Sequence, residues 1–274
     1  MQNKRYYVGA YVQYIILALA FLGPVLWMVS SSFKNNVDIT AYPPVILFKP
    51  TLNNYLNLFR VYPFGQYILN SFIITGFSTL LGLILGVPAA YAIARFRLNS
   101  IALLSLLARM APGVLFLIPW YIISTSLHIS SNDFADYLSL ILAHCVITMP
   151  LVVWLMISYF ESIPIDTEES AVIDGCSRWG LFFRIALPLS LPGLAVSTVL
   201  SFIFSWNYFL FALALANNAT MPLTVIAFNF IGEGSADWGG LMAASTIISL
   251  PALILTIFAQ KLLIKGLTAG AIKG

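Results

Sequence analysis

Long apolar stretches dominate this chain, and they constrain its fold more than any other feature. Only 8% of the 274 residues are Asp, Glu, Lys or Arg, and 60% are hydrophobic. A soluble domain carries about 25% charged residues, so this chain has too few charges to cover a surface exposed to water. Since a helix needs roughly 20 apolar residues to cross a bilayer, the pattern predicts a helical membrane protein.

Six stretches are long and apolar enough to span a membrane. They lie near residues 11–33, 68–94, 101–125, 137–160, 192–216 and 239–262. The sequence therefore predicts an all-α membrane protein with six transmembrane helices, forming a single domain over residues 1–274. Gly82 and Gly86 lie four residues apart in the second stretch. This spacing fits close packing against a neighbouring helix, but the motif is weak alone and ordinary helix packing explains it more often.

The positive charges predict how the chain lies in the membrane. Six spans place both termini on one side, where nine Lys and Arg residues fall. Lys34, Lys49 and Arg60 fall on the other side. Because cytoplasmic loops carry an excess of Lys and Arg, the termini, the segment 161–190 and the tail 263–274 are predicted to be cytoplasmic.

Charge is concentrated in the segment 161–190, between the fourth and fifth stretches. The charged residues there are Glu161, Asp166, Glu168, Glu169, Asp174, Arg178 and Arg184. Small residues lie at the centre of the segment, acidic residues flank them, and apolar side chains form a ridge. Such a surface suits docking into a groove on a cytoplasmic partner. The alternative is an amphipathic helix that lies on lipid.

Local signals predict two helices in this segment. Asp166 is a candidate N-cap with Glu169 at position N3, the arrangement of a capping box. Gly175 is a candidate end of that helix, because glycine accepts a left-handed turn. Ser177 is a candidate cap of a second short helix, which Pro188 would end. The pattern therefore predicts a helix–turn–helix between two membrane spans.

The spacing within residues 169–188 resembles the EAA motif of the permease subunits of ABC importers. Glu169-Ser170-Ala171 is followed after three residues by Gly175, and after nine more by Ile185-x-Leu187-Pro188. Ser170 stands where the motif usually has alanine, and it is also small. The resemblance implies that this segment is a coupling loop seated in a cleft of an ATP-binding subunit. The coupling residues that it implies are Glu169, Ser170, Ala171, Asp174, Gly175, Ile185, Leu187 and Pro188.

Four further elements resemble the carbohydrate-type members of that family. They are PTLNNY at 50–55, Asn70-Ser71 followed by AAYAIARF at 89–96, Ser205-Trp206-Asn207, and GLTAGAIKG at 266–274. The last is similar to the tail of the maltose-type G permease. In that family the tail reaches the ATPase dimer, so the resemblance implies an ATPase contact by Thr268, Ala269 and Gly270.

The resemblance implies a membrane subunit of a binding-protein-dependent importer in the cell (inner) membrane of a bacterium or archaeon. Such a subunit moves an oligosaccharide or sugar derivative into the cytoplasm by ATP-driven alternating access. The implied partners are a second, related permease chain, two ATP-binding subunits and an extracytoplasmic solute-binding protein.

Nucleotide chemistry is not expected on this chain. The sequence contains no P-loop motif, so ATP and Mg are expected on the ATPase subunits. We expect no catalytic residue, no metal site and no resident cofactor. The small net charge of +3 gives no reason to expect nucleic acid as a partner.

Arg109 fits this scheme least well, because it lies about eight residues into the third stretch. A charge inside a span is costly and usually faces a cavity or a partner. Arg109 therefore lines the substrate path, pairs with the neighbouring permease subunit, or lies at a span boundary drawn too far out. Trp206, Asn207 and Tyr208 raise the same question, since aromatic and amide groups serve sugar binding and helix packing equally well.

Three other functions are alternatives. A membrane enzyme is one of them, but the sequence shows no convincing catalytic cluster. An ABC importer for a non-sugar solute would share the EAA motif. A secondary transporter or channel usually carries acidic residues inside the membrane, and none of the ten Asp and Glu residues lies in the middle of a predicted span.

Overall fold

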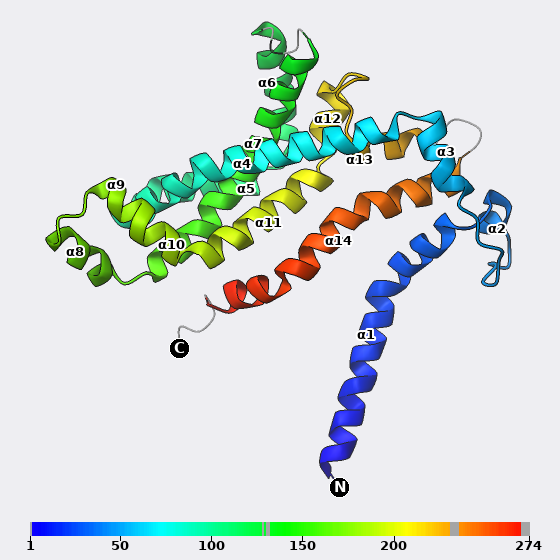
Figure 1. Ribbon diagram of the computed structural model, residues 1–274, viewed down its shortest axis with the longest axis horizontal. Coiled ribbons are helices and arrows are strands. Elements are labelled where there is room, and N and C mark those ends of the chain that lie inside the picture. The colour runs from blue at the N-terminus through cyan, green and yellow to red at the C-terminus, as the bar shows by residue number, and fades with distance from the viewer. Residues whose placement is uncertain (1, 128, 130–131, 231–235, 270–274) are drawn as a thin grey trace. The chain divides into compact units, whose positions relative to one another are not determined.

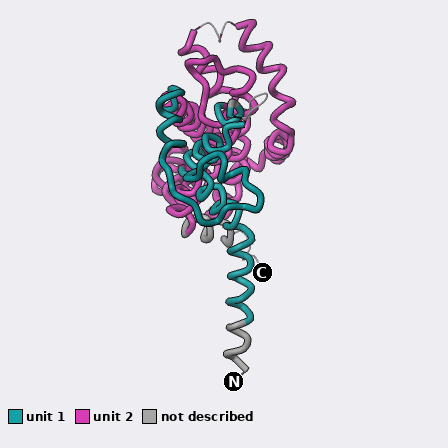
Figure 2. The backbone as a smooth tube through the Cα atoms, turned by 90° about the vertical axis from the view of Figure 1, so that its right-hand side faces the viewer, with its two compact units in different colours: residues 1–65, 226–250 teal, residues 66–225, 251–274 magenta. Residues whose placement is uncertain are grey.

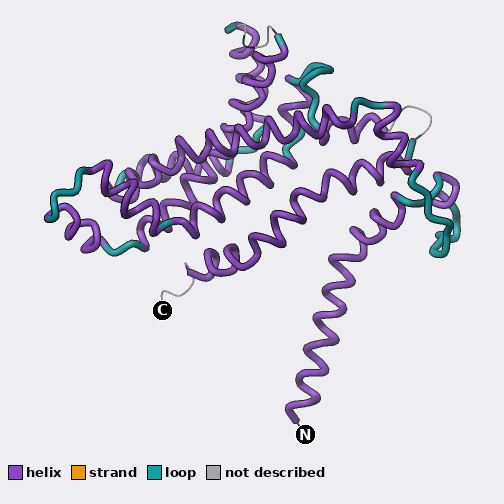
Figure 3. Tube along the Cα trace, in the orientation of Figure 1, coloured by secondary structure: helices purple, strands orange, loops and turns teal. Residues whose placement is uncertain are grey.

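A computed structural model describes residues 2–127, 129, 132–230 and 236–269, with side chains for residues 9–127, 129, 132–228, 230 and 236–260. The described part of the chain consists of helices joined by turns and loops, and it contains no β-sheet (Figure 3). The predicted all-α fold is confirmed.

Four continuous helices are long and apolar enough to cross a membrane (Figure 1). They are α1 (Gln2–Ser32), α4 (Phe64–Phe96), α7 (Asp133–Ser162) and α14 (Trp238–Ala269). Two bent pairs have the same apolar character: α5 (Asn99–Met110) meets α6 (Val114–Ser126) at 96°, and the helical run Arg178–Leu189 meets α11 (Leu191–Asn207) at 75°. Counting each bent pair as one span gives up to six spans, although the run Arg178–Leu189 lies in the segment 161–190 and outside the fifth predicted stretch.

The third predicted stretch, 101–125, is not one straight helix. It breaks between α5 and α6, where Ala111 adopts an extended backbone with ψ of 131°. Pro112 explains the break, because a proline disfavours the helical conformation of the residue before it. The fifth stretch, 192–216, also breaks: Tyr208 is extended (φ −86°, ψ 105°) between α11 and α12 (Leu210–Leu215).

Shorter helices lie between the spans. They are α2 (Asn36–Thr40), α3 (Asn53–Val61), α8 (Ile165–Ile173), α9 (Arg178–Gly180), the π-helical turn η1 (Leu181–Ala186), α10 (Leu187–Leu189), α13 (Leu223–Ile226) and the 3₁₀ turn η2 (Ala227–Phe230).

The chain divides into two compact units, residues 1–65 with 226–250 and residues 66–225 with 251–274 (Figure 2). The expectation that the whole chain is a single permease domain stays a prediction.

In the first unit, residues of the PTLNNY element form hydrogen bonds with the end of α1. The side-chain amide of Asn54 donates hydrogen bonds of 2.8 Å to the carbonyls of Ser32 and Lys34. The Tyr55 hydroxyl lies 2.7 Å from Ser32 Oγ. The last carbonyls of a helix have no partner within the helix, so Asn54 supplies donors that the end of α1 lacks.

The Lys34 side chain is fully buried in the same unit. Its ammonium group donates to the carbonyl of Val45 at 2.8 Å. It also lies 4.1 Å from the ring centre of Trp27 and 5.0 Å from that of Phe48. Aromatic faces attract cations, so two rings and a carbonyl hold this charge.

In the second unit, α4 and α7 pack closely through the two glycines of the second stretch. A Cβ atom on Gly82 would lie 2.9 Å from Thr148 Oγ1, and one on Gly86 would lie 3.0 Å from Val152 Cγ1. Both distances are shorter than ordinary contacts, so a side chain at either position would require the neighbouring atoms of α7 to shift. The close packing expected from the glycine spacing is confirmed.

The two ends of α4 contact different parts of the second unit: the start of the helix contacts residues 219–223, and its other end contacts α7 and η1. At its start, Asn70 Nδ2 donates to the carbonyls of Ala219 and Met221 at 2.8 Å, and Ser71 Oγ accepts from the Leu223 amide at 2.7 Å. At its other end, α4 joins a buried cluster with α7 and η1. The cluster consists of Val87, Ala90, Val152, Met156, Phe160, Ile163, Phe182 and Ala186. This cluster supports the segment 161–190.

Candidate functional site

The helix–turn–helix predicted for residues 161–190 is present, and its turn has the expected geometry. Gly175 has φ of +84°, a left-handed value that favours glycine. Its amide donates to the carbonyl of Val172 at 3.0 Å, and the Cys176 amide donates to that of Ala171 at 2.9 Å. These two bonds form a Schellman motif, so Gly175 ends α8 as predicted.

The start of α8 differs from the expectation. Asp166 is not the N-cap, because α8 begins at Ile165 and Pro164 occupies the capping position without a side-chain hydrogen bond. The Pro164 carbonyl accepts from the Thr167 amide at 3.2 Å and starts the helix early. The predicted capping box of Asp166 with Glu169 is therefore wrong. Asp166 instead lies in the first turn, where its charge suits the helix dipole.

The second helix begins as predicted, with Ser177 Oγ accepting from the Gly180 amide at 3.1 Å. The helical run continues to Leu189, so Pro188 lies inside it, one residue before the end. The turn before the proline is widened into η1, in which the Leu187 amide bonds to the Phe182 carbonyl five residues back.

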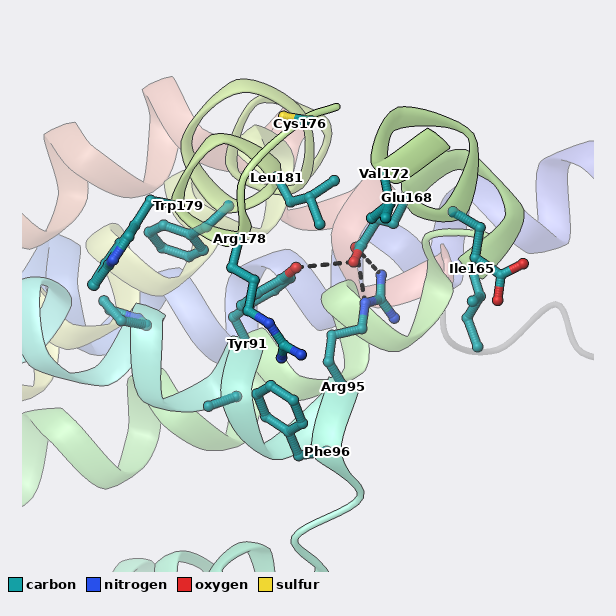
Figure 4. A pocket seen from close by; sticks show the side chains of 14 residues that line it. Tyr91, Arg95, Phe96, Ile165, Glu168, Val172, Cys176, Arg178, Trp179 and Leu181 are labelled. Carbon is teal, nitrogen blue, oxygen red and sulfur yellow. Dashed lines mark hydrogen bonds and ion pairs between the residues drawn. The ribbon is translucent and has the colours of Figure 1, made fainter. Parts of the chain in front are cut away.

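Glu168 and Glu169 are adjacent, but they face different surroundings. Glu168 is the only buried residue of α8. Its carboxylate lies 2.6 Å from Arg95 Nη2 and accepts a hydrogen bond of 2.9 Å from the Tyr91 hydroxyl (Figure 4). Glu169 is exposed, and within the residues that the structure describes it forms no ion pair. The sequence analysis predicted a coupling role for Glu169 and did not identify Glu168 as a functional residue.

The outer surface of the helix–turn–helix combines small, acidic and apolar side chains. Ser170, Asp174 and Gly175 are exposed and Ala171 is half-buried. Two large apolar side chains are unusually open, Ile173 at 85% and Trp179 at 72% of their full exposure. Exposed apolar surface of this kind marks sites that contact a protein or a membrane.

A pocket of about 620 Å³ lies between this segment and the end of α4 (Figure 4). Its lining is Pro88, Tyr91, Ala92, Arg95, Phe96, Ile165, Glu168, Glu169, Val172, Cys176, Arg178, Trp179, Leu181 and Phe182. The guanidinium of Arg178 lies 5.6 Å from the ring centre of Phe96. Both halves of the helix–turn–helix therefore face the end of α4.

The predicted anchor residues of the second helix differ in their placement. Leu187 is half-buried and packs against the buried cluster described above. Ile185 is half-buried and Pro188 is exposed. The side chains that enter the cluster from this helix are Phe182 and Ala186. Their spacing of four residues, which places them on one face of a helix, is the sequence signal that identifies them.

The four candidate residues of a substrate path lie near the two breaks in the spans. Arg109 is in the last turn of α5, and its guanidinium lies 4.6 Å from the ring centre of Phe204 on α11. A Cβ on Gly113 would overlap the Tyr208 hydroxyl. The break in the third span therefore lies against the end of α11, which brings Arg109 and Tyr208 into one region.

Trp206 and Asn207 are held within this region in different ways. Trp206 is buried and stacks on Phe202, with ring centres 5.7 Å apart and an interplanar angle of 14°. Asn207 is exposed, and its amide donates to the Ile203 carbonyl at 2.9 Å. Trp206 thus has an evident packing role, whereas the Asn207 side chain is exposed and its amide bonds to its own helix.

The structure also places His144 beside this region. His144 Nδ1 lies 2.9 Å from Ser205 Oγ, which lies 2.9 Å from Ser78 Oγ. The ring of His144 meets that of Tyr208 edge to face at 5.9 Å. A short polar chain thus joins α4, α7 and α11. The tail residues Thr268, Ala269 and Gly270 lie outside the residues whose side chains are described.

Several apolar helices, together with a helix–turn–helix between two of them, define a helical membrane protein. The family described as "Binding-protein-dependent transport system inner membrane component" matches residues 78–269. The chain belongs to this family, so it is a multi-pass membrane protein and a transport subunit. The predicted membership of the ABC importer permeases is confirmed.

Several curated relatives match nearly the whole chain. A probable ABC transporter permease protein, y4oR of Sinorhizobium fredii, is 36% identical over 94% of this chain and 92% of its own length. The sulfoquinovosyl glycerol transport system permease protein SmoH of Agrobacterium fabrum is 35% identical over 94% and 91%. The trehalose/maltose transport system permease protein MalG of Thermococcus litoralis is 32% identical over 95% and 94%.

A solved structure has the same fold. It is a chain of a bacterial ABC transporter involved in the import of the acidic polysaccharide alginate, with a TM-score of 0.76 over 95% of this chain and 97% of that chain. Its sequence identity of 22% is low. The match therefore supports the fold, and the family assignment comes from the sequence relatives.

Proposed function

We propose that this chain is the permease subunit of an ABC importer that moves an oligosaccharide or sugar derivative into the cytoplasm. In this proposal the helix–turn–helix at 161–190 is the coupling loop. ATP hydrolysis on separate subunits moves the loop, and the spans then alternate between outward-open and inward-open arrangements.

The observation that carries the coupling role is the contrast between Glu168 and Glu169. Glu168 is buried against α4 and fully paired, whereas Glu169 presents its carboxylate at the surface of the same helix. An exposed carboxylate beside Ser170 and Ala171 offers a basic residue of an ATPase both a charge and room to approach. Gly175 and Asp174 complete the turn at the end of this surface.

The proposed assembly contains more than this chain. We propose a heterodimer with a second, related permease, two ATP-binding subunits that carry ATP and Mg, and a solute-binding protein outside the membrane. One solved relative of the fold is a bacterial alginate ABC transporter in complex with an alginate pentasaccharide-bound periplasmic protein. Both termini and residues 161–190 are proposed to be cytoplasmic, as the positive-charge distribution indicates.

The sugar class is supported by the names of several relatives. Besides the two named above, they include a trehalose permease of Mycobacterium tuberculosis and a diacetylchitobiose permease of Streptomyces coelicolor. We propose that Arg109, Asn207 and Tyr208 line the sugar path, with Trp206 supporting them from its buried position. Guanidinium and amide groups are suitable donors to sugar hydroxyls.

The remaining roles follow the family resemblance. Leu187, Ile185 and Pro188 are proposed to tie the coupling loop to the membrane domain. Thr268, Ala269 and Gly270 are proposed to reach the ATPase subunits.

The first test is Glu169→Lys in the complete importer, reconstituted in lipid nanodiscs with its binding protein. A like charge placed opposite a basic partner costs several kcal/mol, so solute-stimulated ATP hydrolysis is expected to be lost. Glu161→Lys is the matched control, since Glu161 is an exposed carboxylate on α7. Normal stimulation in Glu169→Lys would refute the coupling role.

The second test identifies the assembly and the solute. The chain is purified from native membranes in mild detergent, and its partners are identified by mass spectrometry. An ATP-binding subunit and a second permease are expected. The binding protein is then screened against sugars and non-sugar solutes. Binding of a non-sugar solute alone would replace the proposed substrate class, and a chain that purifies alone would favour a self-contained transporter or channel.

A further inference from the structure

We propose that Glu168 is a positioning residue, which makes α8 and the cytoplasmic end of α4 move as one body during transport. The proposal rests on the proposed coupling role of the segment 161–190. It concerns the link between that segment and the spans, and Glu169 keeps its separate role at the docking surface.

Both oxygens of the Glu168 carboxylate are occupied. Oε1 lies 2.6 Å from Arg95 Nη2 and accepts from Arg95 Nε at 2.8 Å, while Oε2 accepts from the Tyr91 hydroxyl at 2.9 Å. Tyr91 and Arg95 are four residues apart, so they lie on the same face of α4. Figure 4 shows the three side chains converging from the two helices. Charge-assisted bonds of this kind are short and strong.

The pair is shielded from solvent. The Arg95 and Glu168 side chains expose only 13% and 9% of their full surface to solvent. They form the single ion pair in the described part of the chain. Arg95 Nη2 also donates to the carbonyl of Ile163, just before α8, at 3.3 Å. Removing one partner would leave an uncompensated charge at a buried position, which is strongly unfavourable.

Glu168 is the side chain through which α8 is held. No other residue of α8 is buried, and its large apolar side chains Ile165, Val172 and Ile173 are exposed. The helix therefore has no apolar anchor of its own. A displacement of α8 by a docked partner reaches α4 directly through Glu168, besides the two chain ends of the helix and its contacts with η1.

The part of α4 that binds Glu168 packs closely against its neighbours. The Tyr91 ring lies 5.3 Å from that of Phe160 on α7 and 5.2 Å from that of Phe182 on η1, measured between ring centres. Gly86 seats the same helix directly against α7. One residue, Tyr91, thus contacts the charged anchor of α8 and the apolar anchor of the second helix. Both halves of the coupling loop meet at the same point of α4.

The experiment compares graded variants in the complete reconstituted importer. Glu168→Gln removes the charge, Arg95→Lys removes the two-pronged geometry while keeping the charge, and Tyr91→Phe removes one hydrogen bond while keeping the ring. Two values are measured for each: the yield of assembled complex by size-exclusion chromatography, and the ratio of solute-stimulated to basal ATP hydrolysis per assembled complex. Glu161→Gln and Arg97→Lys are the matched controls.

We expect Glu168→Gln to lower the ratio about fivefold or more, within the range typical of coupling between two sites. Arg95→Lys should lower it less, and Tyr91→Phe least. The double swap Glu168→Arg with Arg95→Glu should restore part of the ratio. A role confined to folding predicts a lower yield of complex with a normal ratio per complex, and that result would overturn the proposal.

The outcome also separates this proposal from the proposed function. Normal ratios in Glu168→Gln and Arg95→Lys, with Glu169→Lys uncoupled, would overturn the positioning role and leave the importer function intact. A wild-type complex that shows no solute-stimulated hydrolysis would instead overturn the proposed function itself.

Discussion

Replacing Gly175 with alanine tests whether the turn of the helix–turn–helix matters for coupling. Gly175 has φ of +84°, and a Cβ added there would meet no atom within 4 Å. The penalty for Gly175→Ala is therefore conformational and contains no clash. A left-handed conformation costs a residue with a side chain about 1–2 kcal/mol. This free energy lowers the population of the native turn about 5- to 30-fold relative to alternatives.

The assay titrates purified ATPase subunit against the permease complex in nanodiscs and measures Kd. Gly175→Ala should weaken binding by up to the same 5- to 30-fold, because docking must then restore the turn. Gly175→Asn is the control, since asparagine tolerates left-handed conformations better, and it should weaken binding less. An alanine variant that binds like wild type, or an asparagine variant weaker than alanine, would refute the reasoning.

Two further predictions concern the spans. Gly86→Ala places a Cβ 3.0 Å from Val152 Cγ1, and overpacking costs about 1–3 kcal/mol, so the thermal midpoint of the detergent-solubilised protein should fall. Gly76→Ala, on the same helix with nothing within 4 Å, should leave the midpoint unchanged or raise it, and a fall there would contradict the explanation. Arg109→Ala should change the affinity or specificity of sugar uptake. Unchanged uptake of each accepted sugar, with normal assembly, would instead assign Arg109 to packing against Phe204.

Local signals in the sequence predicted the features that depend on neighbouring residues. The apolar spans, the turn at Gly175 and the cap at Ser177 each follow from a short segment. The turn and the cap are present, and the structure has four continuous apolar helices, or up to six spans if each bent pair is counted as one. The two breaks, at Pro112 and Tyr208, were not predicted. Hydropathy averages over a window of residues, so a stretch that bends in the middle looks the same as a straight one.

The choice between Glu168 and Glu169 shows why the site was only partly predictable. Successive residues of an α-helix point about 100° apart, so one of two adjacent glutamates can face inward while the other faces outward. Which one does so depends on where the helix begins and how it lies on α4. Pro164 starts α8 earlier than expected, and the partner Arg95 is 73 positions away, so neither fact follows from the segment itself.

The burial of Lys34 has a consequence for chemical mapping of the membrane topology. Its amine is covered by Trp27 and Phe48 and bonded to a backbone carbonyl, whereas Lys49, in the same loop, is exposed. With the orientation proposed above, a membrane-impermeant, amine-reactive label applied from outside should modify Lys49 in the folded protein and leave Lys34 unmodified. Lys34 becomes reactive when the loop unfolds, so one pair of lysines reports both the orientation of the chain and whether this loop is folded.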